Sequence, residues 1–429
     1  MKPSNTTKRR PIGIDLFAGA GGLSLGFEQA GFDIAAVVEI DPIHCATHEY
    51  NFPNSAVICA SVVNVTGEEI RRKANLGSAD VDVVFGGAPC QGFSMIGKRA
   101  LDDPRNQLVF HYVRLVFELQ PKYFVFENVK GLTLGKHAEF LSELIAALEA
   151  AGYDVLSPYQ VLNAASYGVP QDRKRLFVIG ARRGLDVPTY PKSHDQRVSV
   201  WDAIGDLPDA DNFDALIAAD EVRTKWKTDS LYAQQLRGLE TDSTDFGYAR
   251  EFDHTILTSS LRTAHTALSM QRFMATEHGE TEPISRFRKL PPNGLCNTLR
   301  AGTDSARGAF TSPRPIHPFL PRVITVREAA RLHSYPDWFR FHMTKWHGFR
   351  QIGNSVPPLL GRAVASEVMQ ALGIKPRKPK LLLQSGELDL LAFDMGAASR
   401  YFQVPRDTIA QRTRKQSANQ QELWKEANV

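Results

Sequence analysis

One cysteine lies in a loop whose composition suits a reactive group. Cys90 stands in the run from Gly86 to Ser94, directly after an apolar segment over 81–85 that reads as a buried strand. An ionised cysteine is the side chain best suited to attack an electron-poor ring carbon at neutral pH. A lone cysteine near a strand end is more often a small buried hydrophobic residue. The other chemistry-bearing residues of the chain decide between these interpretations.

An acid and two arginines follow along the chain. Glu127 comes after the apolar run 123–126, so we expect it at the carboxyl edge of a sheet, beside the cysteine. Arg173 and Arg175 precede a strand predicted over 176–180, and residues two apart on extended backbone point the same way. Both guanidinium groups can then face one pocket. Taken alone, the acid would be a solvated or helix-terminal charge, and the arginines an exposed basic turn.

A glycine-rich turn near the N-terminus predicts a second half of the site. Residues 12–17 form an apolar run of strand length, the glycines of 18–22 follow, and apolar residues at helical spacing come next. Glycines let the backbone approach a ligand closely, and a helix N-terminus offers free N–H groups. A second predicted strand, 32–38, ends in Glu39, where an acid can accept hydrogen bonds from ribose hydroxyls. The glycine spacing differs from the dinucleotide pattern, which favours a cofactor without a pyrophosphate, such as S-adenosylmethionine.

Alternating strand and helix patterns position these residues. From about residue 12 to 183, strands alternate with helices predicted over 65–73, 107–119 and 137–150. This alternation predicts an α/β fold with a doubly wound, mostly parallel sheet. From about 184 to 320, turn residues and short segments replace the alternation, which predicts a second, smaller and irregular domain.

Six blocks, in their order along the chain, resemble the motifs of the DNA cytosine-5 methyltransferases. The blocks are Asp15 to Gly22, Glu39, Pro89-Cys90-Gln91, Glu127-Asn128-Val129, Gln171 to Arg175 and Gly353 to Pro358. A seventh, Arg327 to Leu332, is similar to the helix that supports the family's target recognition region. The resemblance implies a Rossmann-like, S-adenosylmethionine-dependent methyltransferase of the restriction–modification type.

The resemblance also implies covalent catalysis on cytosine. Cys90 is then the nucleophile that adds to carbon 6, which lets carbon 5 take a methyl group from S-adenosylmethionine. Glu127 is the acid or hydrogen-bond partner at ring nitrogen 3 and the exocyclic amine, where charge builds as sulfur adds. Arg173 and Arg175 complete the catalytic set, one toward the base carbonyl and one toward the backbone or the acid. The target base must be flipped out of the duplex, at a cost of about a few kcal/mol.

The cofactor residues implied by the resemblance come from several places along the chain. They are Asp15, Phe17, Ala18, Gly19, Ala20, Gly21, Gly22, Glu39, Ile40, Ser61, Val62, Pro89, Leu108, Asn354 and Val356. Ser61 departs from the family, which usually carries an aspartate there that contacts the adenine amino group. Serine can still form a hydrogen bond, but without a charge. No metal is implied.

Two regions are predicted to contact DNA. The segment 91–105 is suited to close over the flipped base, with Gln91, Ser94, Lys98 and Arg99 in reach of DNA. The irregular domain carries Arg286, Arg288, Thr298 and Leu299, and we expect this domain to read bases from the major groove. Any single arginine here is more often a phosphate contact or a solvated charge.

These patterns divide the chain into four parts. They are the first part of a catalytic and cofactor-binding domain (11–183), a target recognition domain (184–322), a return segment that completes the catalytic domain (323–374) and a C-terminal extension (375–429). Thr325 is predicted to cap a helix, with Glu328 completing a capping box. In the extension, 396–410 fits a helix-turn-helix, a docking hairpin or a partly ordered tail.

Composition sets limits on location and partners. The chain has 429 residues and no apolar run of membrane-spanning length, which is about 18 residues or more. Its four cysteines lack short paired spacings, which disfavours a zinc site or a disulfide framework and suits a reducing compartment. A net charge of only +4 requires the basic residues that hold DNA to gather on one face. We expect a cytoplasmic, DNA-associated monomer of a bacterial or archaeal cell.

The expected partner is double-stranded DNA, and a cognate restriction endonuclease would act on the same site without forming a stable complex. Two alternatives stay open. One is an RNA cytosine-5 methyltransferase with the same apparatus, which the sizeable recognition region disfavours. The other is a non-catalytic DNA-binding relative, which the presence of Cys90, Glu127 and both arginines disfavours.

Overall fold

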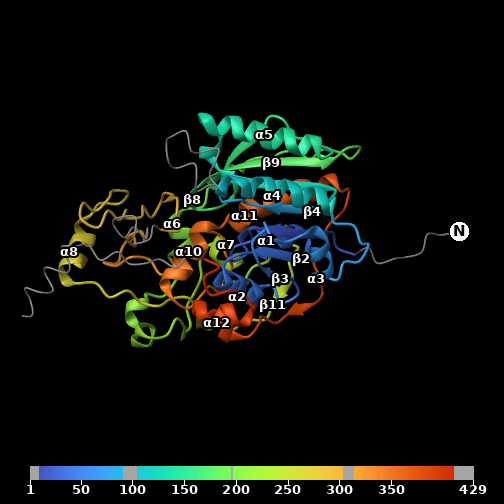
Figure 1. Ribbon diagram of the computed structural model, residues 1–429. Helices are drawn as coiled ribbons and strands as arrows, with labels where there is room; N and C mark the ends of the chain where they lie inside the picture. The colour runs from blue at the N-terminus through green and yellow to red at the C-terminus, as the bar shows by residue number, and fades with distance from the viewer. Residues whose placement is uncertain (1–8, 90–103, 195–196, 303–313, 410–429) are drawn as a thin grey trace, which may run out of the picture.

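The computed structural model describes residues 9–89, 104–194, 197–302 and 314–409 (Figure 1). Some residues predicted to act lie outside this part of the chain, namely Cys90, Gln91, Ser94, Lys98 and Arg99.

An eight-stranded sheet forms the centre of the described chain. Its order is β3 (Ala56–Cys59), β2 (Asp33–Glu39), β1 (Ile12–Leu16), β4 (Val83–Gly86), β5 (Tyr123–Val129), β9 (Lys174–Arg182) and β6 (Tyr153–Val155), and β7 (Gln160–Asn163) also pairs with β9. The first five strands are parallel, and β9 runs antiparallel to its neighbours. The doubly wound, mostly parallel sheet is therefore confirmed. The chain reverses its direction of travel across the sheet between β1 and β4, where α/β sheets bind ligands outside the strands' carboxyl ends.

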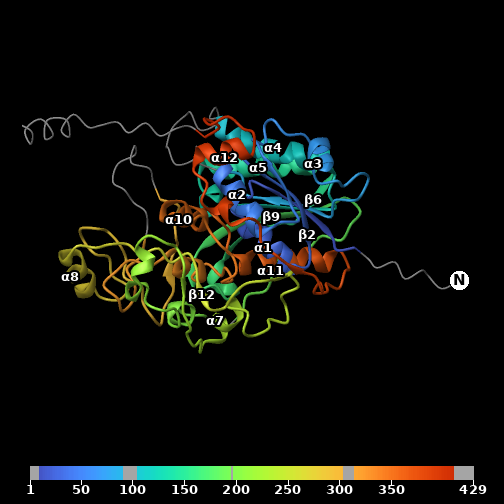
Figure 2. The ribbon, with the colours of Figure 1, turned by 90° about the horizontal axis from the view of Figure 1, so that it is seen from below.

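Helices cover both faces of the sheet (Figures 1 and 2). One face is covered by α3 (Gly67–Lys73), α4 (Pro104–Leu119) and α5 (Lys136–Ala150). The other is covered by α1 (Gly22–Ala30) and α11 (Pro358–Ala371). The last two helices pack backbone to backbone, because a Cβ added to Gly26 would lie 2.6 Å from the backbone nitrogen of Arg362. Segments more than three hundred residues apart in sequence thus build one core.

Most predicted elements are present, with shifted ends. The helix predicted from 107 begins at Pro104, and the strand predicted from 81 begins at Val83. The prediction that Glu127 follows its strand is wrong, because β5 continues to Val129. The cause is the antiparallel ladder with β9, in which Glu127 pairs with Phe177 and the pairing runs on to Val129.

The irregular region packs onto the part of the chain that carries the large sheet, through a shared hydrophobic cluster. Its longer elements are α6 (Val200–Ile204), α7 (Leu231–Leu236) and α8 (Ala267–Ala275), and α8 lies at the far left of Figure 1. Side chains of α6 and α7 share a core with those of α9 (Val326–Arg331) and α10 (Lys345–Asn354).

Two-residue strands add local pairing, β10 (Val222–Arg223) with β12 (Ile256–Leu257) and β13 (Cys296–Asn297) with β8 (Gln171–Asp172). Short 3-10 helices span Lys130–Thr133, Ala164–Tyr167, Ala210–Asn212, Asp214–Ile217 and Leu388–Leu391.

Buried ion pairs fix α9 against this region. The Arg331 guanidinium is fully buried. It donates to both carboxylate oxygens of Asp337, at 2.6 and 2.7 Å, and to both of Asp206, at 3.2 and 3.5 Å. The predicted capping box at the start of α9 is present, because Thr325 and Glu328 exchange hydrogen bonds. Glu328 also receives two hydrogen bonds from Arg322. A buried charge is costly without its partner, so this network depends on each member.

The structure describes the C-terminal extension from residue 375 to Ile409. It contains β14 (Leu382–Leu383), which pairs in parallel with β11 (Ala249–Arg250), and α12 (Met395–Tyr401). A turn rather than a second helix follows α12 up to Ile409. Among the described residues, none of the helices has the length and apolar character needed to cross a membrane.

Candidate active site

The turn between β1 and α1 is open on one side. Gly19 and Gly21 adopt left-handed backbone, with φ of 56° and 99°, which glycine tolerates best. A Cβ added to Gly19 would meet nothing within 4 Å, whereas one added to Gly22 would lie 2.5 Å from the Val356 carbonyl oxygen. The turn therefore presents bare backbone on one side and packs tightly against the Asn354–Val356 segment on the other.

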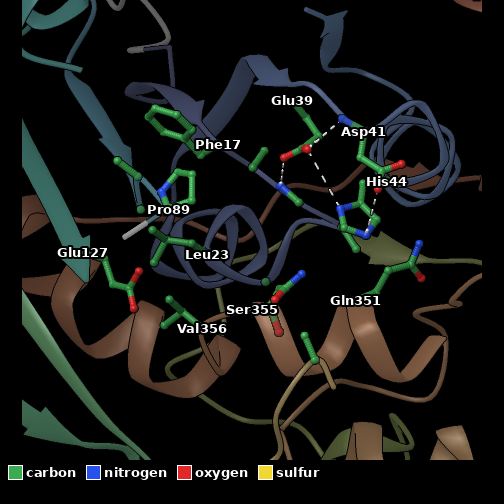
Figure 3. A pocket seen from close by; sticks show the side chains of 18 of the residues that line it. Phe17, Leu23, Glu39, Asp41, His44, Pro89, Glu127, Gln351, Ser355 and Val356 are labelled. Atoms are coloured by element: carbon green, nitrogen blue, oxygen red, sulfur yellow. Dashed lines mark hydrogen bonds and ion pairs between the residues drawn. The ribbon is translucent and has the colours of Figure 1, made fainter. Parts of the chain in front are cut away.

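Glu39 lies across the mouth of this turn (Figure 3). Its Oε2 accepts a hydrogen bond from the Gly19 N–H at 2.8 Å, and its Oε1 accepts one from the Asp41 N–H at 2.9 Å. Each carboxylate oxygen can accept more than one bond, so both keep capacity for a ligand hydroxyl. The buried carboxylate is thereby fixed by the backbone of the loop that it faces.

A single cavity of about 640 Å³ joins the predicted halves of the site. Every predicted cofactor residue except Gly21 lines it: Asp15, Phe17, Ala18, Gly19, Ala20, Gly22, Glu39, Ile40, Ser61, Val62, Pro89, Leu108, Asn354 and Val356. Gly21 instead turns toward the protein interior, where a Cβ would lie 2.5 Å from the Phe52 ring. The volume lies within the roughly 300–1,000 Å³ that small-molecule sites occupy.

Asp15 lies at the buried floor of the cavity. Its Oδ2 accepts a hydrogen bond of 2.5 Å from the Ser24 hydroxyl, which also lies 3.2 Å from Nε2 of His48. Burial raises the pKa of Asp15 well above its usual range, and the nearby charge of Glu39 adds to the shift. Burial lowers the pKa of His48 to about 3, so this ring stays neutral.

Ser61 also lines the cavity. Its hydroxyl accepts a hydrogen bond of 3.3 Å from the Val63 N–H and so supports the turn that follows β3.

Glu127 and Arg175 form an ion pair in the cavity wall, with 2.9 Å between Oε1 of the acid and Nε of the arginine. Burial raises the pKa of Glu127 above its usual value, although the charges of Arg175 and Arg173 oppose the shift. Gly87 gives the acid its space, because a Cβ there would lie 2.3 Å from Oε2 of Glu127. The acid thus lies directly against the loop that leads to Pro89 and Cys90.

Asn128 holds the same loop from the next position of β5. Its Nδ2 donates to the Ala88 carbonyl oxygen at 3.0 Å, and its Oδ1 accepts from the Val129 N–H at 2.8 Å. Pro89, the residue before Cys90, lies in the cavity wall. The carboxyl ends of β4 and β5 are therefore tied together at the cavity.

Arg173 is fully buried and faces backbone rather than the acid. Its guanidinium donates to the carbonyl oxygens of Leu299 at 2.7 Å, Gly353 at 2.8 Å and Ser355 at 2.7 Å. Gln171 supports the same junction, since its Oε1 accepts from the Leu299 N–H at 3.1 Å. Arg173 therefore connects the irregular region to the C-terminal end of α10, and Gln171 connects it to Leu332, whose carbonyl oxygen accepts from Nε2 of Gln171 at 3.2 Å.

The residues predicted to read DNA fall into two settings. Thr298 and Leu299 line the cavity, Thr298 donates to the Asp172 carbonyl oxygen at 2.6 Å, and the Leu299 side chain is buried in the shared core. Arg286 and Arg288 are exposed on the irregular region. The structure therefore brings the first pair to the predicted catalytic residues and leaves the second pair at the surface.

Four further cavity residues stand in the predicted blocks, namely Asn128, Val129, Gly353 and Ser355. The remaining lining residues were not predicted, and they are Leu23, Val38, Asp41, His44, Ala60, Gly87, Ala88, Arg300, Ala301, Arg350, Gln351 and Ile409. A sequence signal existed for some of them, because Arg300 directly follows the Thr298-Leu299 element and Arg350 precedes Gly353 by one helical turn. No local pattern points to Ile409.

Comparison with known proteins gives one family and several relatives. The family described as C-5 cytosine-specific DNA methylase matches residues 13–370. The type II methyltransferase M.XorII of Xanthomonas oryzae pv. oryzae is 65% identical over 405 residues, which cover 94% of this chain and 95% of that protein. M1.HphI of Haemophilus parahaemolyticus is 36% identical over 83% of this chain and 86% of its own length. An E. coli prophage protein, described as a DNA modification methyltransferase, has a crystal structure with a TM-score of 0.71 and 36% identity over 85% of this chain and all of that one.

Proposed function

The chain belongs to the C-5 cytosine-specific DNA methylases and is a DNA cytosine-5 methyltransferase of the restriction–modification type, and we propose that it methylates a flipped-out cytosine through a covalent adduct with Cys90. The methyl donor in this proposal is S-adenosylmethionine, and the substrate is a specific sequence in double-stranded DNA. The enzyme acts as a monomer in the compartment that holds the chromosome. A cognate nuclease cuts the same site without a stable complex.

The observation that carries the proposal is the single cavity shared by two kinds of residue. Its one side is the open glycine turn with Glu39, and its other side is the Glu127–Arg175 pair with Pro89 leading to Cys90. A donor and a base can therefore meet in one cavity. Neither half alone would favour methyl transfer over simple binding.

The residues of the glycine turn fit a nucleoside with a charged tail. Glu39 is fixed with free acceptor capacity for ribose hydroxyls, Phe17 and Ile40 offer apolar surface in the wall, and Gly19 leaves the backbone bare. Ser61 is the proposed partner of the adenine edge. Bound there, S-adenosylmethionine supplies an electrophilic methyl group for carbon 5.

The groups on the other side act on the cytosine ring. The Cys90 thiolate forms a bond to carbon 6, and the electron pair displaced toward ring nitrogen 3 is met by a proton or a hydrogen bond from Glu127. The raised pKa of Glu127 supports this role, because an acid that stays protonated nearer neutral pH can donate. Transfer of the methyl group to carbon 5 would leave S-adenosylhomocysteine. The carbon-5 proton then passes to a water molecule, its electron pair re-forms the ring double bond, and the sulfur–carbon bond breaks to return Cys90 as a thiolate. Arg175 orients the acid throughout.

Methyl transfer to defined substrates tests the proposal. Purified enzyme with radiolabelled S-adenosylmethionine should label duplex DNA and not tRNA, and bisulfite sequencing of DNA from expressing cells should reveal one methylated sequence. Labelling of tRNA alone would favour the RNA-directed alternative. Cys90→Ser should retain cofactor binding and lose transfer, because an alcohol is far less ionised than a thiol.

A trapping experiment tests the covalent route. A duplex with 5-fluorocytosine at the target should form a denaturation-resistant complex when the donor is present, because fluorine cannot leave as a proton does. Cys90→Ser should form no such complex. If wild-type enzyme methylates the normal duplex but is not trapped by the fluorinated one, the covalent adduct is wrong.

A further inference from the structure

The described chain after α11 wraps around α2 (Pro42–Asn51). In Figures 1 and 2, α12 lies beside α2 in both views. The wrapping begins where β14 pairs with β11 and the Glu251 N–H donates to the Leu383 carbonyl oxygen at 3.0 Å. It continues at Gly386, whose N–H donates to the Tyr50 carbonyl oxygen of α2 at 2.8 Å. The extension is thus bonded to the protein backbone before it reaches the outer side of α2.

A small hydrophobic cluster stabilises the contact between the extension and α2. Leu390 and Leu391 of the extension are buried against Ala46 and Tyr50 of α2. Phe393 and Phe402 pack on the same cluster. Burial of such side chains is a dominant stabilising term in protein folding, so the contact holds the extension firmly.

Polar contacts flank the cluster on both sides. The Met343 N–H donates to the Leu391 carbonyl oxygen at 2.9 Å, and Nε2 of His342 lies 2.9 Å from the Phe393 carbonyl oxygen. At the other end, the Tyr401 hydroxyl donates to Oε1 of Glu49 at 2.5 Å. The extension therefore bridges α2 and the segment that leads into α10.

The helix that the extension covers leads directly to the cavity. Asp41 caps the N-terminus of α2 and follows Glu39, the acid at the glycine turn. All residues of α2 except Glu49 are buried, although half of them are polar or charged, which is unusual for a helix beside the edge of a sheet. The extension covers one part of α2, and α10 covers another, where Nε2 of Gln351 donates to the Thr47 hydroxyl at 2.8 Å.

After α12 the chain returns toward the same cavity. Arg406 lies near the start of α12, because its Cζ is 3.7 Å from the position that a Cβ on Gly396 would take. Ile409, a half-buried residue at the end of the described chain, lines the cavity together with Phe17, Ile40 and Asp41. An apolar side chain from outside the family's matched region, 13–370, therefore forms part of the cavity wall.

We propose that Ile409 is a methyl-donor-binding residue and that the C-terminal extension, residues 375–409, exists in part to place it there. The inference rests on the proposed function, because it assigns this cavity to S-adenosylmethionine. The Ile409 side chain covers apolar surface of the bound donor, while the packing of the extension on α2 keeps Glu39 and Asp41 at the glycine turn.

The test is a calorimetric titration of the full-length, DNA-free protein with S-adenosylhomocysteine. We expect Ile409→Ala to weaken binding by about tenfold, the effect of losing roughly 50–60 Å² of apolar contact at the usual value per area. Ile409→Leu should bind nearly as the wild type does. Ile217→Ala is the matched control, since Ile217 is 65% exposed in a 3-10 helix and does not line the cavity.

Steady-state kinetics separate a binding role from a general structural one. In Ile409→Ala, the KM for the donor should rise while kcat and the KM for DNA stay unchanged, and the melting temperature should match that of the wild type. The assignment would be overturned if Ile409→Ala lowered kcat, the affinity for DNA and the melting temperature as much as the affinity for the donor. It would also be overturned if the variant bound S-adenosylhomocysteine within twofold of the wild type. Measurements on the wild-type protein test the proposed function separately. The proposed function is wrong if the wild type neither binds S-adenosylhomocysteine nor transfers a methyl group.

Discussion

Replacing Gly87 with alanine should disable the enzyme while leaving its fold intact. The added Cβ would lie 2.3 Å from Oε2 of Glu127, whereas ordinary contacts begin at 3.4 Å, so the acid must move by about 1.1 Å (3.4 − 2.3). Gly87 does not have the left-handed φ that penalises alanine, so the clash is the main effect. The displaced carboxylate would also leave its position 2.9 Å from Nε of Arg175.

A misplacement of about 1 Å at a reacting group can cost about 100-fold in rate, which equals roughly 2.7 kcal/mol of activation free energy. We therefore expect single-turnover methylation by Gly87→Ala to be about 100-fold slower, with S-adenosylhomocysteine binding unchanged. Gly131→Ala is the matched control. A Cβ there would meet only Val129, at 3.9 Å, so its rate should stay near that of the wild type.

A double-mutant cycle identifies the cause of the loss. When Glu127 is already alanine, the oxygen that clashes is absent, so adding Gly87→Ala should slow the reaction little further. Full additivity of the two losses would mean that Gly87 acts through something other than the acid. A correctly folded Gly87→Ala enzyme with a rate within threefold of the wild type would refute the steric argument altogether.

Three further predictions follow from buried or cavity-lining groups. Ser61→Asp should leave the affinity for S-adenosylhomocysteine unchanged or increase it, by up to the roughly 1.5–3 kcal/mol of a charge-assisted hydrogen bond. A large loss of this affinity in a calorimetric titration would show that Ser61 does not face the adenine edge. Arg173→Lys should lower the melting temperature and weaken donor binding, because a lysine ammonium group cannot bond three carbonyl oxygens in the way that the planar guanidinium group does. Each buried carbonyl oxygen left unpaired costs about 1–3 kcal/mol, so an unchanged melting temperature would contradict this prediction. Arg322 lowers the pKa of Glu328 to about 2, so Glu328 stabilises the fold above the ordinary glutamate pKa of about 4.3 and loses this contribution as pH falls toward 2. Urea unfolding should therefore show the wild type to be more stable than Glu328→Gln by roughly 3 kcal/mol at neutral pH, and this difference should shrink between about pH 4 and 2. A difference that stays constant with pH would show that protonation of Glu328 does not cause it.

The features that local sequence predicts well are those set by neighbouring residues. The strand, glycine turn and helix at the N-terminus, and Glu39 at the end of the next strand, follow from hydrophobic period and glycine placement within about thirty residues. The capping box of Thr325 and Glu328 is equally local. The end of β5 was misjudged because it depends on pairing with β9, about fifty residues later in the chain. Sequence alone could not show that Glu127 is held inside a ladder.

The orientation of the two arginines illustrates the limit more sharply. Their spacing predicted that both could face one pocket, and both do line it, but their partners come from elsewhere in the chain. Arg175 bonds Glu127, whereas Arg173 binds carbonyl groups at Leu299, Gly353 and Ser355, up to 182 residues away. Arg173 thereby joins the irregular region to the segment whose Val356 packs against the glycine turn. If the cavity binds the methyl donor and the base as we propose, one buried side chain supports both parts of it. A change at Arg173 should then appear in donor binding as well as in methylation, whereas a change at Arg175 should appear in methylation alone.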